Sequence, residues 1–146
     1  MPVKVGESAP DFTLMSHLGV PVSLNDFRGK KSIVLYFYPK DDTPGCTKQA
    51  CSFRDAMSEY QNKDVVVLGV SVDDEASHQQ FTQKYNLNFP LLADTEKTLV
   101  KAYDVDGGGY AKRVTYVIDG NGKIVHVDGS VNTSSHANDV LTAIGL

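Results

Sequence analysis

Residues 33–51 read IVLYFYPKDDTPGCTKQAC, and this stretch contains both cysteines of the chain. Its first part, Ile33 to Tyr38, is a continuous apolar run, which is typical of a strand covered on both faces. Its second part carries the signals of a helix start. Thr43 suits the N-cap, and Pro44 suits the first helical position, where its missing N–H costs nothing. The stretch therefore predicts a buried strand that leads through a short loop into a helix with Cys46 near its start.

The helix is expected to run from Cys46 to Tyr60. At about 100° per residue its apolar side chains fall on one stripe, which should pack against the sheet. This stripe consists of Cys46, Ala50, Phe53, Met57 and Tyr60. A second apolar run, Val65–Val72, predicts another buried strand. Two parallel strands joined by a helix form a unit with a right-handed crossover.

Shorter elements are expected on both sides of this unit. A hairpin precedes it, with strands at Phe12–Met15 and Pro21–Leu24. The elements expected after it are helices at Glu75–Tyr85, Lys97–Tyr103 and about Ser135–Ile144, and strands around Leu91–Leu92, at Val114–Ile118 and at Lys123–Val127. The last two strands flank Asp119-Gly120-Asn121-Gly122, a strong hairpin signal. Together they predict an α/β chain with a mixed central sheet, helices on both faces and an N-terminal hairpin, in a thioredoxin-like layout.

The length and composition of the chain are those of one ordinary domain. The chain has 146 residues, close to the ~150 used as a prior for one domain, and 41% of them are hydrophobic. That share supports a core that needs no disulfide or metal, so we expect a single domain over residues 1–146. The net charge is -4, and the lysines and arginines are scattered. Nucleic acid and anionic membranes are therefore not expected as partners.

We expect no secretory signal in the first residues of this sequence. Met1 to Phe12 has no apolar region of the kind found in secretory signals. No apolar run approaches the ~20 residues that a membrane-spanning helix needs. We expect a soluble, cytoplasmic protein, although a mature organellar form with its targeting segment removed would have the same signature.

Cys46 would lie in the first turn of its helix, where reactivity at sulfur is favoured. Free backbone N–H groups and the positive end of the helix dipole stabilise a thiolate there, and the thiolate is the nucleophilic form of cysteine. A lone cysteine on an apolar stripe is otherwise most often a small core residue. The N-cap at Thr43, the proline at Pro44 and the second cysteine, Cys51, favour a reactive Cys46.

A metal site is not expected. Zinc sites use about four ligands at characteristic spacings, and the histidines do not show them. These histidines are His17, His78, His126 and His136. His78 shares a helix face with Phe81 and Tyr85, which is interpreted as core packing. We expect neither a metal nor another cofactor, and redox chemistry at the cysteines remains.

The spacing of the two cysteines predicts a helix that must move. Cα atoms five residues apart on a helix are separated by ~8.7 Å, beyond the ~7 Å that a disulfide tolerates. In a C-x-x-C pair they are only about 5 Å apart, within that range. Cys46 and Cys51 can therefore pair only if the start of the helix unwinds. This suits a cycle of oxidation, local unfolding and disulfide closure.

The segment around Cys46 resembles a known family. Residues 36–47 read YFYPKDDTPGCT and contain the pattern P-x-x-x-T-P-x-C of the peroxiredoxins. Cys51 resembles the resolving cysteine of the Q-type branch, the bacterioferritin comigratory proteins. APDF at residues 9–12 and RVTYVID at residues 113–119 extend the resemblance over nearly the whole chain.

The resemblance implies a role for each site residue. Cys46 would attack a hydroperoxide, either hydrogen peroxide or an organic one, and become a sulfenic acid. Arg113 would pair with the thiolate and with the charge developing on the peroxide oxygens. Thr43 would hydrogen-bond the thiolate and the peroxide, and Pro39 would shield the pocket from water. Cys51 would condense with the sulfenic acid, and thioredoxin or a similar dithiol would reduce the disulfide. Many members of this branch are monomers, and we expect a monomer here.

Two other functions fit the same cysteines. One is a thiol-disulfide oxidoreductase on the same fold, but the chain lacks C-x-x-C and lacks a proline just before Val114. The other is a peroxide sensor that passes oxidation to a partner protein. Sensor and enzyme need the same nucleophile, so the sequence leaves this alternative open.

Overall fold

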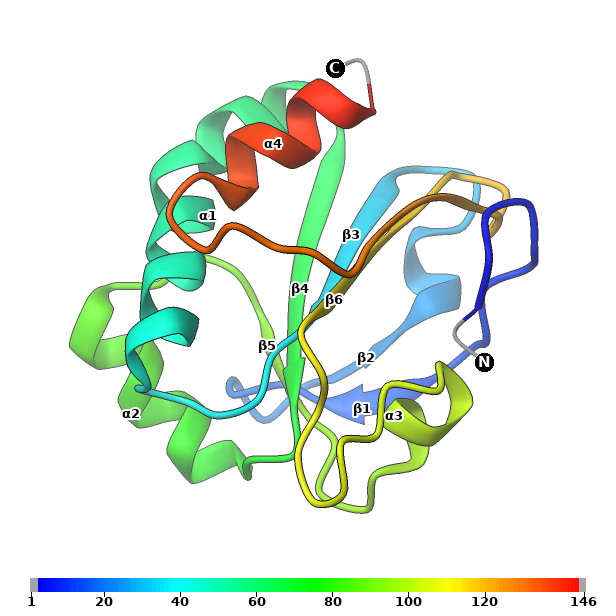
Figure 1. Ribbon diagram of the computed structural model, residues 1–146. Coiled ribbons are helices and arrows are strands. Elements are labelled where there is room, and N and C mark those ends of the chain that lie inside the picture. Colours follow the sequence, from blue (N-terminus) through cyan, green and yellow to red (C-terminus); the bar gives the residue numbers. More distant parts are fainter. Residues whose placement is uncertain (1–2, 145–146) are drawn as a thin grey trace.

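The central strand of the molecule is β3 (Ser32–Phe37), the apolar run that precedes the cysteine segment. The computed structural model describes residues 3–144 (Figure 1). β3 pairs in parallel with β4 (Val65–Ser71) and antiparallel with β6 (Val114–Ile118). Its residues from Ile33 onward are at most 2% exposed, as expected for a strand with neighbours on both sides and layers on both faces.

Two shorter strands complete a five-stranded mixed sheet of order β5-β4-β3-β6-β7. β5 (Leu91–Ala93) is parallel to β4, and β7 (Ile124–Asp128) is antiparallel to β6. The turn between β6 and β7 is closed by a hydrogen bond from Gly122 N–H to the Asp119 carbonyl at 3.0 Å. Gly122 has φ +79°, a conformation that favours glycine, so the predicted hairpin is confirmed.

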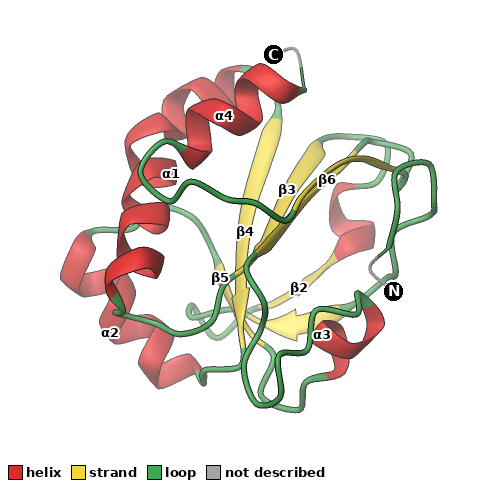
Figure 2. Ribbon diagram, viewed as in Figure 1, coloured by secondary structure: helices red, strands yellow, loops and turns green. Residues whose placement is uncertain are grey.

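One face of the sheet is covered by α1 (Pro44–Asn62) and α4 (His136–Ala143), with α2 (Glu75–Tyr85) beside them (Figures 1 and 2). The expected stripe of α1 is buried along its full length. It packs with Val34, Tyr36 and Val67 of the sheet, and with Val140 and Leu141 of α4. The periodicity of the sequence therefore identified the packed side of this helix.

The opposite face is covered by the N-terminal hairpin and by α3 (Thr98–Ala102). The hairpin consists of β1 (Thr13–Met15) and β2 (Pro21–Ser23), which pair antiparallel. Leu24, which the sequence placed in the second strand, instead begins a short 3-10 helix, η1 (Leu24–Phe27). The Ser23 N–H donates to the Asp26 carboxylate at 2.9 Å, and this local bond ends the strand before Leu24.

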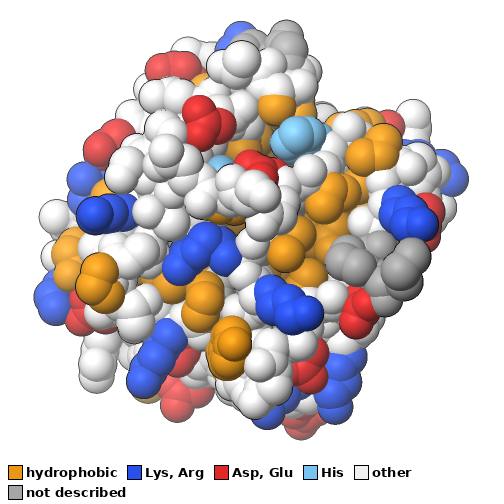
Figure 3. Space-filling model, in the orientation of Figure 1, with side chains coloured by type: hydrophobic (Ala, Val, Ile, Leu, Met, Phe, Trp, Pro, Cys, Tyr) orange, Lys and Arg blue, Asp and Glu red, His pale blue; other side chains and the backbone are white. Residues whose placement is uncertain are grey.

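The predicted mixed sheet, its helices and the hairpin are confirmed, and most element bounds agree within two residues. On the face shown in Figure 3, lysine and arginine side chains are spread out, with acidic side chains among and around them. Within residues 3–144, no helix is both long and apolar enough to cross a membrane.

Candidate active site

Cys46 lies in the first turn of α1, as the cap signals predict. Thr43 occupies the N-cap position with extended backbone angles, and Pro44 is the first helical residue. Cys46 is a free thiol and only 1% exposed. The sulfur is therefore at the positive end of the longest helix and almost out of contact with water, where partial positive charge acts strongly on a thiolate.

Arg113 is brought to Cys46 by the register of the sheet. Phe37, the last residue of β3, pairs with Val114, the first residue of β6. The residue before β6 therefore lies where the chain leaves β3 for α1. Arg113 Nη2 donates to Cys46 Sγ at 3.2 Å, across 67 residues of sequence. A guanidinium keeps its charge at every relevant pH, so it can stabilise a thiolate at this distance.

Gln49 holds the other side of the Arg113 guanidinium. Arg113 Nη1 donates to Gln49 Oε1 at 2.6 Å, and Gln49 is fully buried. Sequence reasoning did not select Gln49. Its position three residues after Cys46, one turn along the same helix, was the available signal. Because both terminal nitrogens of the guanidinium are engaged, the one that faces sulfur has little freedom to rotate away.

Gly45 marks a close approach between α1 and Arg113. A Cβ atom at Gly45 would lie 3.1 Å from Arg113 Nη2 and 3.8 Å from the Thr133 methyl group. The loop that leads into α4 thus borders the site as well. The absence of a side chain at Gly45 allows the guanidinium to lie against the helix backbone beside Cys46.

Thr43 and Pro39 lie in the loop between β3 and α1. Thr43 is the N-cap residue, but its hydroxyl makes no side-chain cap bond to the helix. It donates instead to the Lys40 carbonyl at 2.8 Å. Pro39 is half-buried in the same loop. For Thr43 to donate a hydrogen bond to a bound peroxide or to the thiolate, its hydroxyl would have to leave the Lys40 carbonyl.

Cys51 is on α1 too, but it is turned away from the site. It is a free, partly exposed thiol, whereas the neighbouring Ala50 and Phe53 are buried in the core. α1 is continuous from Pro44 to Asn62, so helix geometry puts the two Cα atoms ~8.7 Å apart. The structure brings Arg113 to Cys46 and keeps Cys51 from it.

Aromatic side chains belong to the same core cluster as Cys46. Tyr36 stacks on Phe53 with ring centroids 4.8 Å apart. Burial, and then the charge of the nearby Cys46, raises the pKa of Tyr36 well above its ordinary value. Tyr36 therefore stays neutral and does not compete with Cys46 for the positive charge of Arg113. Within residues 3–144, no group of three or more His, Cys, Asp and Glu side chains could hold a metal ion.

This arrangement has the parts of a nucleophilic thiol site: a buried sulfur, a helix N-terminus and a fixed cation. The AhpC/TSA family model matches residues 5–127. The putative peroxiredoxin bcp of Coxiella burnetii (strain RSA 493 / Nine Mile phase I) is 46% identical over 97% of this chain and 98% of its own length. Peroxiredoxin Bcp of Bacillus subtilis (strain 168) is 40% identical over 99% of this chain and 96% of its own.

A solved structure shows the same fold. A bacterioferritin comigratory protein of Xanthomonas campestris, described for its alkyl peroxide reduction activity in trapped intermediate and ligand complexes, has a TM-score of 0.85 and 32% identity. The alignment covers 92% of this chain and 90% of that one.

Proposed function

This chain belongs to the AhpC/TSA family and is a thiol peroxidase, and from that premise we propose that Cys46 is its peroxide-reducing nucleophile and Cys51 its resolving thiol. The observation that supports this assignment best is the 3.2 Å bond from Arg113 to Cys46 Sγ at the start of α1. A cysteine whose function was only to fill the core would have no use for a half-buried guanidinium held in place by Gln49.

In the first step the Cys46 thiolate attacks one oxygen of a hydroperoxide. The O–O bond breaks, the sulfur gives up two electrons and keeps that oxygen, and the alcohol or water leaves after taking a proton. Negative charge develops on the leaving oxygen. Arg113 Nη2 is already oriented next to the sulfur and can stabilise that charge without rearranging. Thr43 is the second donor in our proposal, once a peroxide replaces the Lys40 carbonyl as its acceptor.

In the second step the Cys51 thiol attacks the Cys46 sulfenic acid. An S–S bond forms and water leaves, with the proton supplied by the thiol. The geometry of α1 keeps the two sulfurs apart, so this step needs unwinding at the start of the helix.

In the third step an external dithiol reduces the disulfide and is itself oxidised. We propose thioredoxin or a similar protein as this reductant, because local unwinding would expose the Cys46 sulfur to a partner. We further propose that the chain works as a monomer in the cytoplasm, with nucleic acid and membranes playing no part.

Two serine variants test the assignment of the cysteines. Cys46→Ser should abolish peroxide consumption in a coupled thioredoxin assay, because serine is a far weaker nucleophile. Cys51→Ser should keep the first oxidation of Cys46 but fail to turn over with thioredoxin, because the sulfenic acid has no partner thiol in the chain. Substantial turnover by Cys46→Ser would show that the nucleophile is wrongly assigned. If the wild type is oxidised but never turns over with the thioredoxin system, the peroxide-sensor function is supported instead.

Arg113→Ala tests the cation. The variant should have a smaller thiolate fraction at neutral pH and a slower first oxidation, by about tenfold to a thousandfold, the range seen when one transition-state donor is removed. Thiolate absorbance in the ultraviolet and rapid-quench oxidation would measure the two effects. Arg54→Ala is a matched control, because Arg54 is on the same helix as Cys46 but pairs with Asp55. Equal oxidation rates in Arg113→Ala and the wild type would remove Arg113 from the site.

A further inference from the structure

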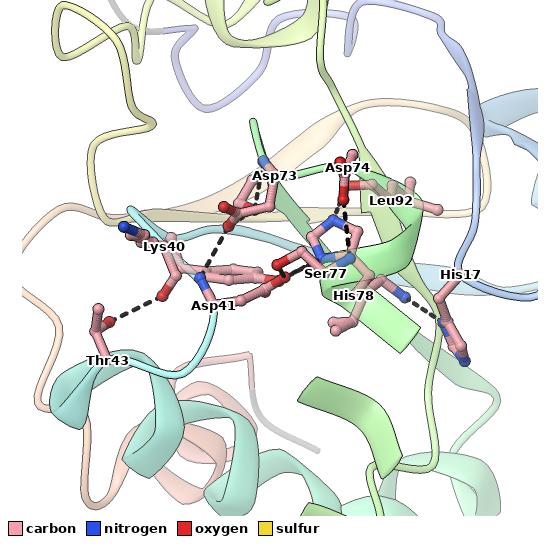
Figure 4. Close-up of polar contacts among 12 residues, drawn as sticks. His17, Lys40, Asp41, Thr43, Asp73, Asp74, Ser77, His78 and Leu92 are labelled. Atoms are coloured by element: carbon pink, nitrogen blue, oxygen red, sulfur yellow. Dashed lines mark hydrogen bonds and ion pairs between the residues drawn. The ribbon is translucent and has the colours of Figure 1, made fainter. Parts of the chain in front are cut away.

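A second polar cluster lies beside the loop that carries Thr43, outside the machinery described above. Its centre is Asp41, which is 8% exposed and points toward the start of α2 (Figure 4). Asp41 Oδ1 accepts from the Tyr38 hydroxyl at 2.6 Å. Asp41 Oδ2 accepts from Ser77 Oγ at 2.8 Å and lies 2.6 Å from His78 Nδ1. The side chain of Asp41 therefore joins this loop to α2.

His78 extends the connection into the sheet. It is fully buried, and its Nε2 lies 2.9 Å from the Leu92 carbonyl of β5. A carbonyl only accepts, so Nε2 carries a hydrogen. Nδ1 and Asp41 Oδ2 then share one further proton at 2.6 Å. His78 is buried as expected, but it is part of a polar network and does not simply fill the core.

A neighbouring contact on the same loop is of a different kind. Asp42 accepts from Lys84 Nζ at 2.7 Å and from the Tyr85 hydroxyl at 2.8 Å, near the end of α2. Its side chain and that of Lys84 are 41% and 58% exposed. Exposed pairs stabilise little, whereas breaking a buried charged pair leaves an uncompensated group in a dry site. The Asp41–His78 pair is therefore the stronger of the two attachments.

Asp41 lies close in sequence to the segment of α1 that must unwind during the proposed reaction. Asp41 precedes the N-cap residue by two positions and Cys46 by five. The start of α1 must unwind before Cys46 can reach Cys51, and this loop is where the unwinding segment joins the fixed sheet. A loop held firmly on α2 keeps the helix start ordered.

We propose that Asp41 and His78 form a latch that holds the loop on α2, keeps Cys46 beside Arg113, and limits how fast the start of α1 unwinds. This inference rests on the proposed function, since it concerns closure of the Cys46–Cys51 disulfide. A closed latch prolongs the life of the sulfenic acid, and a second peroxide can then oxidise it to sulfinic acid. The latch thus sets the balance between disulfide closure and over-oxidation.

Three variants distinguish an effect of the latch on unwinding from a general effect on the stability of the fold. Asp41→Ala removes the loop side of the pair and leaves the His78–Leu92 bond in place. Asp41→Asn is the conservative variant: its Oδ1 can accept from Tyr38, and its amide can donate to a neutral His78 Nδ1 and to Ser77 Oγ. Asp42→Asn is the matched control, because it breaks the exposed pair and asparagine tolerates the φ of +57° at that position.

The measurement is rapid-quench mass spectrometry after mixing each reduced protein with hydrogen peroxide, which resolves thiol, sulfenic acid, disulfide and sulfinic acid. In Asp41→Ala, disulfide closure should be at least about tenfold faster and the sulfinic acid yield at high peroxide at least about tenfold lower. The variant loses the contacts with Tyr38, Ser77 and His78, and one lost hydrogen bond to a charged group already accounts for that factor. The first oxidation should slow by less than about twofold, because the folded arrangement remains the major one. Asp41→Asn and Asp42→Asn should behave like the wild type.

The opposite signs of these effects make the test decisive. If Asp41→Ala slows the first oxidation without speeding closure, the pair only stabilises the fold and the latch is wrong. The latch is equally wrong if Asp42→Asn speeds closure as much as Asp41→Ala, or if Asp41→Asn fails to restore the wild-type rate. If Asp41→Ala folds too poorly to measure, His78→Gln takes its place. The rate of disulfide closure in His78→Gln is then compared with the rate in Asp41→Asn. If the wild type itself forms no Cys46–Cys51 disulfide, the proposed function fails, and not the latch alone.

Discussion

At Gly45 the backbone of α1 and the guanidinium of Arg113 lie so close that a single methyl group would disturb them. A Cβ there would lie 3.1 Å from Arg113 Nη2, tighter than an ordinary contact. Arg113 cannot easily move aside, because Gln49 holds its other nitrogen at 2.6 Å. The position of Arg113 beside Cys46 thus depends on the lack of a side chain at Gly45. Helix propensity alone would favour alanine over glycine at this position.

Gly45→Ala should therefore separate stability from activity. Alanine in a helix is favoured over glycine by about 0.5–1 kcal/mol, so the free energy of unfolding should not fall. The first oxidation of Cys46 should slow by about tenfold, because the cation is displaced from the sulfur, and 1.4 kcal/mol of lost stabilisation gives that factor. Denaturant unfolding and rapid-quench oxidation measure the two quantities. Gly129→Ala is a suitable control, since no atom lies within 4 Å of a Cβ there. An oxidation rate unchanged in Gly45→Ala would show that Arg113 adjusts freely.

At the scale of the element, the proposed function places two conflicting requirements on the first turn of α1. Its first turn must be ordered to place Cys46 at the helix N-terminus beside Arg113. The disulfide that we propose requires the same turn to unwind, so that Cys46 can meet Cys51. The remainder of the helix is held by buried residues that include Met57 and Tyr60, so unwinding can be confined to the start.

Hydrogen exchange on reduced and oxidised protein should detect this change. Amides from Gly45 to Arg54 should lose protection in the disulfide form, because the helix that holds them must open. The strand from Ile33 to Tyr38 should keep its protection in both forms and serves as the internal control. Cys51→Ser treated with peroxide should stay protected throughout, since no disulfide can close. Equal protection of residues 45–54 in the reduced and oxidised wild type would mean that these cysteines do not pair within one chain.

For the whole molecule, the start of α4 joins α1 and β6, two elements that lie far apart in the sequence. The Tyr60 hydroxyl of α1 donates to the Ala137 carbonyl at 2.7 Å, and the Ala137 N–H donates to Ser52 Oγ at 3.0 Å. His136, fully buried, bonds to Thr115 of β6 through Nε2 at 2.8 Å. Burial is the main cause that lowers the pKa of His136 to about 4, so the folded protein holds this ring neutral.

Stability should consequently fall as the pH is lowered from about 6.5 toward about 4. In this window the unfolded chain binds a proton at His136 and the folded chain does not, so acid favours unfolding. The loss between pH 7.5 and pH 5 should be about 2 kcal/mol from this residue, at ~1.4 kcal/mol per pKa unit. Urea unfolding of the wild type and of His136→Gln at both values measures the difference. A variant that loses as much stability as the wild type would show that His136 is not the group responsible.

The sequence by itself determined the structural features that depend on residues close together in the chain. The cap signals at Thr43 and Pro44 predicted the start of α1, and spacing predicted the stripe beneath Cys46. Even there, local reasoning missed a competing bond, the one from Ser23 to Asp26 that turns Leu24 out of the second strand. These features are decided within one turn of helix or a few residues of strand, where propensity and periodicity act.

Only the tertiary structure decided which distant groups meet. Arg113 was identified through a family resemblance, since nothing in its neighbourhood distinguishes it from other cations of the chain. Its place beside Cys46 follows from the pairing of Phe37 with Val114. Asp41 and His78, 37 residues apart, meet because α2 packs next to the β3–α1 loop. Such contacts depend on the order and register of the strands, which residues throughout the chain determine together. A local sequence pattern therefore does not predict them.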